Sequence, residues 1–179
     1  MVTAMSRMLV PLALALAACS IPPSSGAIDV EMPDASASPL EWQPVADYLG
    51  HRCGDLDCHG DPQRNFIIYS CDGLRLPASD GGVQLLPGCL TKRTFTTASE
   101  YAATYRSLVG LEPLVIANVF ANQGANADDL TMIRKARGEE AHKGGALITP
   151  GDAQDICLVS WLASATNTAA CAAAVSTTP

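Results

Sequence analysis

The chain has 179 residues and a formal net charge of −7. This acidic balance argues against nucleic-acid binding, which needs a basic face to neutralise phosphates. Aromatic residues make up only 5% of the sequence, so a hydrophobic core has to rely mainly on Leu, Ile, Val and Ala. The length, once the N-terminal targeting segment is set aside, suits one compact domain better than two.

Residues 1–18 have the pattern of a lipoprotein signal peptide. Arg7 precedes an apolar run over 8–18 that is too short to cross a bilayer. The run ends in Leu16-Ala17-Ala18-Cys19, which resembles a bacterial lipobox. The resemblance implies cleavage before Cys19, lipidation of that cysteine and anchoring in a membrane of the cell envelope. Ser20 replaces the aspartate that favours the inner membrane, so we expect the outer membrane. An ordinary cleaved signal peptide is the alternative.

A tether, one domain and a tail are predicted to follow the signal peptide. Residues 19–39 contain four prolines and several serines without apolar periodicity, which predicts a disordered tether. The folded domain is expected over residues 40–165. Residues 166–179 form a short tail of small and polar residues.

The first helix is predicted over residues 44–52, because proline suits the first helical position. Val45, Leu49 and Cys53 recur at a spacing of four, which gives this helix one apolar face. That face leads directly into the most distinctive motif of the chain.

The motif is Cys53-Gly54-Asp55-Leu56-Asp57-Cys58-His59-Gly60. In an exported chain, two cysteines followed by histidine are the arrangement that attaches a c-type haem. Cys53 and Cys58 would then form thioethers, and His59 would be the proximal iron ligand. The common motif has two residues between the cysteines, whereas this one has four, a rarer variant. The alternative is a Cys53–Cys58 disulfide loop with His59 on the surface, and the motif alone leaves both open.

A short β-hairpin is predicted after this motif. Residues 66–69 and 74–76 are apolar or alternating runs, and Cys71-Asp72-Gly73 lies between them. Such runs joined by a glycine-containing turn are typical of hairpins.

Two further helices and a loop are predicted next. Thr97 and Glu100 form a capping box that begins a helix ending at Gly110. Pro113 begins the following helix, which is expected to end at Gly124. Residues 128–133 are expected to form a short turn, and residues 134–142 a solvated, charged loop.

The last predicted helix begins near residue 149. Thr149 is expected to be the N-cap and Pro150 the first helical residue. Ile156, Val159 and Ala163 are spaced to form one apolar face, and Trp161 and Leu162 widen it.

The remaining cysteines predict disulfide bonds. Six cysteines are left when Cys19 is set aside, and an even number in an exported protein indicates an oxidising compartment. Pairing of sequence neighbours gives Cys71–Cys89 and Cys157–Cys171, and the second bond would fix the C-terminal tail to the domain.

Several short segments together resemble a known family. They are Cys58-His59-Gly60, Gly73-Leu74-Arg75-Leu76, residues 132–135, His142-Lys143-Gly144-Gly145 and Ser160-Trp161-Leu162, in that order. The chain over residues 45–163 is similar to the c-type cytochrome domains of exported bacterial lipoproteins of the planctomycete and myxobacterial type. The resemblance implies a mainly α fold: a small, helical, cytochrome c-like domain with long loops. It also implies covalent haem c, and the cysteine spacing is where the chain departs from the family.

The sixth iron ligand has two candidates, Met132 and His142. The other histidine of the domain, His51, is too close to the cysteine motif to reach the opposite haem face. The resemblance favours His142 as the distal ligand, because it lies in the family-like H-x-G-G element. Two histidine ligands give a lower reduction potential than one histidine and one methionine.

The expected function is therefore electron transfer rather than catalysis. The chain lacks the common catalytic motifs, and we expect neither a small-molecule substrate nor a nucleic-acid partner. The expected partners are a membrane, through the lipid anchor, and a redox protein. The alternative is a haem-free, disulfide-stapled envelope lipoprotein that acts as a structural or binding module.

Overall fold

A computed structural model describes residues 39–77 and 95–177 of the chain, and this part is mainly helical, as predicted. The described residues contain six α-helices, one 3-10 helix and no strand. The signal peptide, Cys19, nearly all of the predicted tether and Cys89 lie outside the described residues. Among the described helices, none combines the length and hydropathy needed to cross a membrane. The elements are α1 (Pro39–Cys53), α3 (Ala98–Val109), α4 (Pro113–Ala121), η1 (Ala127–Asp129), α5 (Thr131–Ala136), α6 (Ala153–Leu162) and α7 (Thr168–Ser176).

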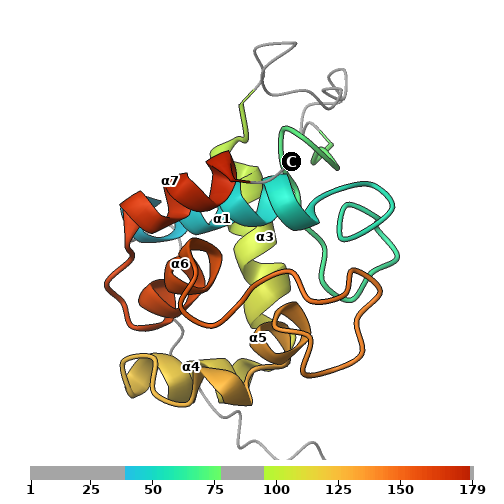
Figure 1. The fold of residues 1–179 in the computed structure, drawn as a ribbon. Coiled ribbons are helices and arrows are strands. Elements are labelled where there is room, and N and C mark those ends of the chain that lie inside the picture. Colours follow the sequence, from blue (N-terminus) through green and yellow to red (C-terminus); the bar gives the residue numbers. More distant parts are fainter. Residues whose placement is uncertain (1–38, 78–94, 178–179) are drawn as a thin grey trace, which may run out of the picture.

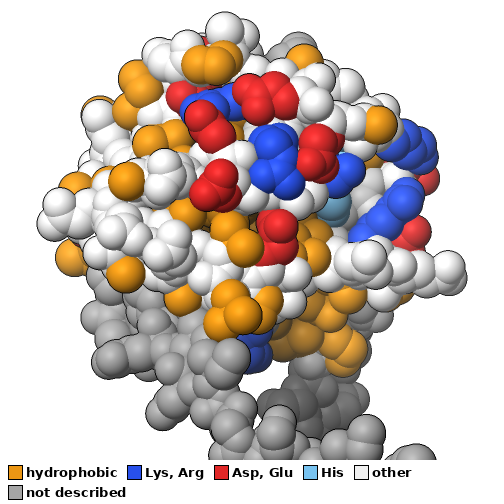
Figure 2. Space-filling view, turned by 90° about the horizontal axis from the view of Figure 1, so that it is seen from below, with side chains coloured by type: hydrophobic (Ala, Val, Ile, Leu, Met, Phe, Trp, Pro, Cys, Tyr) orange, Lys and Arg blue, Asp and Glu red, His pale blue; other side chains and the backbone are white. Residues whose placement is uncertain are grey.

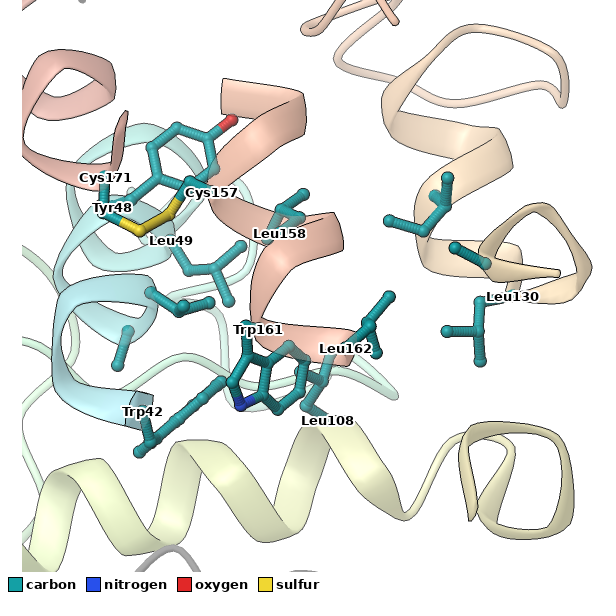
Figure 3. Close-up of a cluster of buried hydrophobic side chains, with 14 of the residues drawn as sticks. Trp42, Tyr48, Leu49, Leu108, Leu130, Cys157, Leu158, Trp161, Leu162 and Cys171 are labelled. Carbon is teal, nitrogen blue, oxygen red and sulfur yellow. A yellow bond between two sulfur atoms is a disulfide. The ribbon is translucent and has the colours of Figure 1, made fainter. Parts of the chain in front are cut away.

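The core is built where α1, α3 and α6 meet, and α7 lies alongside α1 (Figure 1). Trp42 of α1 and Trp161 of α6 have ring centroids 4.9 Å apart, and both are buried (Figure 3). Tyr105 of α3 lies edge-on to Trp42 at 5.4 Å. The Trp42 indole N–H donates to the Tyr101 carbonyl at 2.9 Å, so the ring is buried without losing its hydrogen bond. This aromatic cluster joins three helices that are distant in the sequence.

Helix α1 begins five residues earlier than predicted, and Pro44 lies inside it rather than at its start. An internal proline removes a backbone hydrogen bond and disfavours the helix. The first turn is nevertheless held, because Trp42 is buried and the Glu41 carboxylate accepts the Thr166 N–H at 2.7 Å. The predicted apolar face is confirmed, since Val45 and Leu49 are buried.

The capping box that begins α3 is confirmed. The Glu100 N–H donates to the Thr97 hydroxyl, and the Thr97 N–H donates to the Glu100 carboxylate at 2.8 Å. The helix ends at Gly110 as predicted. Pro113 begins α4, also as predicted, but the helix ends three residues before Gly124. Gly124 has a φ of +81°, a left-handed conformation that glycine adopts readily and that cannot continue a helix.

The prediction of a solvated loop over residues 134–142 is wrong at its start. Helix α5 continues to Ala136. Its first turn is capped from outside, because the Glu112 carboxylate accepts the Thr131 N–H at 2.7 Å. Arg134 then pairs with Glu140 at 2.7 Å. The charged residues of this segment therefore form ion pairs that join the helix to the following loop. The composition of the segment indicates charge but not these partners.

Helix α6 begins later than predicted, and its N-cap is Asp152 instead of Thr149. The Asp152 carboxylate accepts the Asp155 N–H at 2.7 Å, which satisfies one of the free donors at a helix start. Of the predicted apolar face, Trp161 and Leu162 are buried and Val159 packs partly buried against the core, whereas Ile156 is 39% exposed. Cys157 and Leu158, which the prediction did not include, complete the buried face that packs against α1 and α7.

The predicted hairpin does not form. Residues 66–76 contain only an isolated bridge between Tyr69 and Leu74. Three backbone N–H groups of this segment donate to hydroxyls instead of to a second strand. The Ile67, Tyr69 and Cys71 N–H groups donate to Ser107, Thr104 and Thr96 at 2.7, 2.9 and 3.1 Å. The segment is thus docked along α3 and its preceding loop.

The C-terminal tail forms helix α7, and the predicted Cys157–Cys171 disulfide is confirmed. Both sulfurs are buried between α6 and α7, beside Tyr48 of α1 (Figure 3). Cys71 is also disulfide-bonded, and its predicted partner Cys89 lies outside the described residues.

Removing the Cys157–Cys171 bond by a double serine substitution is expected to destabilise the protein by about 3 kcal/mol. The bond closes a loop with a sequence separation of 14, and a loop of about 15 residues gives roughly this gain by restricting the unfolded chain. The measurement is urea unfolding of wild type and variant without reductant. Reductant should then destabilise the wild type by more than it destabilises the variant, whereas equal losses would contradict the assigned role.

Candidate functional site

A single cavity gathers most of the residues singled out in the sequence. It has a volume of about 290 Å³ and lies between α1, α5, α6 and the loops that follow α1 and α5. Figure 2 shows a histidine in a hollow of the surface, with hydrophobic, lysine and arginine side chains beside it. The candidate ligands and attachment residues in the cavity wall are Cys53, His59, Met132 and His142.

His59 is held in an orientation suited to a ligand. Its Nδ1 lies 3.0 Å from the Phe66 carbonyl oxygen, which can only accept, so this hydrogen bond requires the proton on Nδ1. The neutral ring then keeps a free lone pair on Nε2, the arrangement found in histidines that bind metals. Burial lowers the pKa of His59, and the nearby His142 and Arg64 lower it further, although the Phe66 bond opposes them. The imidazole is therefore neutral at pH 7.

His142 lies opposite His59 although 82 residues separate them in the sequence. The ring centroids are 5.9 Å apart and the ring planes differ by 24°. The Phe66 ring contacts the His59 ring at 4.9 Å. The fold therefore brings together the two histidines that the sequence singled out, and one bound group can touch both.

The loop that carries His142 is fastened to α5. The Leu147 and Ile148 N–H groups both donate to the Ala136 carbonyl, at 2.7 and 3.1 Å. Lys135 donates to the Ala141 carbonyl at 2.9 Å. A side chain at Gly144 would approach the His142 ring to 3.1 Å, which explains a glycine in the H-x-G-G element: it leaves room for the imidazole.

Met132, the other candidate sixth ligand, lines the same cavity from α5. Its side chain is partly buried against the core. The structure thus places both candidate ligands in one cavity with His59. Of the two, His142 has its ring close to the ring of His59.

Cys53 and Cys58 are free thiols, so the alternative disulfide loop is not formed in this structure. Cys53 is half-buried in the cavity wall. Cys58 is exposed and does not line the cavity. Burial raises the pKa of Cys53 to about 12. Its thiol therefore stays protonated near pH 7, which excludes a pre-formed thiolate nucleophile at this position.

Glycines allow backbone segments to approach one another closely at the cysteine motif. A side chain on Gly60 would lie 2.3 Å from the Gly54 carbonyl oxygen, and one on Gly73 would lie 2.0 Å from the same atom. Neither distance is possible for a real Cβ. The glycines of the Cys-His-Gly and Gly-Leu-Arg-Leu segments are therefore structural neighbours, a relation that is invisible in their spacing of 13 residues.

Arg75, from the Gly-Leu-Arg-Leu segment, forms a buried ion pair that sequence reasoning missed. Its guanidinium donates twice to the Glu100 carboxylate, at 2.7 and 2.9 Å, and both side chains are at most 2% exposed. Burial raises the pKa of Glu100, but bonds from Arg75, Thr97 and Leu76 outweigh it and lower the pKa overall. Two features of the sequence could have indicated this pair: an arginine between two leucines, and a glutamate in the capping box.

Within the described part of the chain, no cluster of three or more His, Cys, Asp or Glu side chains is arranged to hold a metal ion. The site instead offers two imidazoles, a methionine and a half-buried thiol around a partly apolar hollow. Comparisons with protein-family models, curated proteins and solved structures found no significant match to this chain.

Proposed function

We propose that the protein is a cytochrome c-like electron carrier, with a haem held covalently at the cysteine motif and ligated by His59 and His142. The observation that carries this proposal is the pair of histidine rings, 5.9 Å apart in one cavity that also contains Cys53. Histidine imidazoles can serve as axial ligands of haem iron, and a cysteine beside them can supply one of the two thioethers of a c-type haem.

The residues of the cavity fit this cofactor in three respects. Phe66 orients His59 and leaves its Nε2 free. Tyr48, Leu49 and Leu158 give the wall an apolar part, which suits a porphyrin. Cys53 lies in the cavity wall, whereas Cys58 is exposed and does not line the cavity. The cofactor would supply one-electron redox chemistry at its iron, which none of these side chains can supply.

The membrane part of the proposal rests on the lipobox at Cys19. A lipid anchor would hold the domain at the outer membrane, where it would exchange electrons with a redox protein. The haem-free alternative, a disulfide-stapled module, remains the outcome to which a failed haem test would lead.

The test is an absorption spectrum and a haem-stained denaturing gel of the full chain, produced with cytochrome c maturation genes. We expect a haem spectrum and a stained band at the mass of the chain. The His59→Ala variant should lose the six-coordinate spectrum, and the Cys53→Ser/Cys58→Ser variant should lose the stained band. A wild-type protein that carries no covalent haem, with Cys53 bonded to Cys58 in non-reduced peptides, would overturn the proposal.

A further inference from the structure

The cysteine motif is two residues longer than the common one, and the structure shows how those residues are folded. The His59 N–H donates to the Cys53 carbonyl at 3.0 Å, so the two ends of the motif are bonded directly. The Cys58 N–H donates to the Asp55 carbonyl at 2.9 Å, which closes a turn between them. Leu56 lies in this turn and is 53% exposed. The surplus length is therefore pushed outwards, away from the cavity.

Asp55 caps this turn from within. Its carboxylate accepts the Asp57 N–H at 2.8 Å, the short-range bond of an Asx turn. Its backbone carbonyl also accepts the Gly60 N–H at 2.8 Å. The Asp55 side chain thus holds the turn, and the Asp55 backbone carbonyl holds the backbone on both sides of His59.

Arg64 holds the same turn from outside. Its Nε donates to the Cys58 carbonyl and its Nη2 donates to the Asp57 carbonyl, both at 3.2 Å. The side chain also lies 3.7 Å from the Asp61 carboxylate and lines the cavity. The planar guanidinium can reach two carbonyls at once, which a lysine ammonium on a flexible stem matches poorly.

We infer that Asp55 and Arg64 are positioning residues that fold the four-residue spacer into a capped turn and thereby set Cys58 and His59 for haem attachment. This inference rests on the proposed function. Each thioether forms when a cysteine thiol adds across a haem vinyl group: sulfur bonds to one vinyl carbon, the thiol hydrogen passes to the other, and no oxidant is consumed. The addition at Cys58 requires its sulfur to stay in one place relative to His59, and the capped turn provides this.

The experiment compares variants of the full chain made with maturation genes. A protease that cuts before Asp57 separates the two cysteines, so mass spectrometry counts thioethers at each. Arg64→Ala and Asp55→Ala should each lower the ratio of chains with two thioethers to chains with one about fivefold, the change in a population ratio produced by one net hydrogen bond. Asp55→Asn keeps the acceptor and should behave as wild type, and Gln63→Ala, on an exposed neighbour, is the matched control.

A chain lacking Leu56 and Asp57 has the common two-residue spacer and decides what Arg64 does. If Arg64 serves the spacer, Arg64→Ala should have no effect in the shortened chain. If the loss is the same in both chains, Arg64 acts on the cofactor or on folding, and the inference is overturned. It is also overturned if wild type and both alanine variants are equally loaded. A wild type without covalent haem overturns the proposed function itself.

Amide hydrogen exchange of the haem-free chain gives a readout that does not depend on the cofactor. The His59 and Gly60 amides are bonded within the motif, so their exchange should accelerate in Arg64→Ala and Asp55→Ala. It should stay at the wild-type rate in Asp55→Asn. Unchanged exchange in both alanine variants would contradict the capped turn as their point of action.

Discussion

Replacing Arg75 with alanine is expected to destabilise the protein by about 3–5 kcal/mol, because removing one member of a buried ion pair leaves an uncompensated charge. Glu100 is buried, accepts two bonds from Arg75 and also caps α3. The Arg75 guanidinium donates to the Phe95 carbonyl as well, at 2.9 Å. The substitution therefore loosens the start of α3 and the segment after the cysteine motif together. The measurement is urea unfolding, in which the midpoint should fall at an unchanged slope.

Two variants separate this ion pair from a general effect of charge. Arg106 is exposed on the same helix, and Arg106→Ala should change stability by no more than about 0.5 kcal/mol. The double variant Arg75→Met/Glu100→Leu should lose less than Arg75→Ala, because it leaves no unpaired charge in the core. If Arg75→Ala were no more harmful than Arg106→Ala, the buried pair would have no stabilising role.

The same pair predicts how stability depends on pH. The pKa of Glu100 is lowered in the folded protein from its ordinary value of 4.5. A carboxylate with a lowered folded pKa adds stability that is complete above its unfolded pKa and is lost as pH falls through the folded pKa. The wild type should therefore lose stability below about pH 4.5, and the Glu100→Gln variant should lose less over that range.

Local signals in the sequence predicted local structure well. The capping box at Thr97 and Glu100 begins α3, and Pro113 begins α4. Val45 and Leu49 gave the buried face of α1, and two cysteines in an oxidising context gave the bond between α6 and α7. Each of these depends on residues close in the sequence or on a chemistry with few possible partners.

The failures occurred where distant groups decide the local outcome. A hairpin was predicted over residues 66–76, but hydroxyls of α3 and of Thr96 accept hydrogen bonds from three of the backbone N–H groups of this segment. Helix α6 lost its predicted first turn, because Gly151 has a φ of +86° and Asp152 is the better cap. The buried ion pair of Arg75 was not predicted, because its partner Glu100 lies 25 residues away. No periodicity encodes such partners.

The sequence predicted which residues belong to the candidate site, but it did not predict how they are arranged. The motif selected His59, and elimination left Met132 and His142 as candidates for the opposite side. Their meeting in one cavity depends on the loop after α5 being fastened to Ala136. The fold of the four-residue spacer depends on Arg64, which no motif includes.

Replacing His142 with methionine is expected to raise the reduction potential of the haem-loaded protein on the order of 100 mV or more. A methionine thioether favours reduced iron relative to a second imidazole, and axial ligands set haem potentials over a range of about 0.8 V. His142 lies on a loop whose flanking Gly144 leaves room beside the ring, so a methionine can be accommodated there. The measurement is a spectroscopic redox titration, with the ligand identified from the absorption spectrum.

Met132→Leu is the matched control, because it removes the other sulfur in the cavity with little change in volume. It should leave both spectrum and potential as in wild type, because the proposed sixth ligand is His142, whose ring centroid lies 5.9 Å from that of His59. The His142→Ala variant should lose the bis-histidine spectrum. If Met132→Leu altered the ligand set while His142→Ala left it unchanged, Met132 would be the sixth ligand. In that case the contact between the histidine rings would belong to the haem-free protein alone.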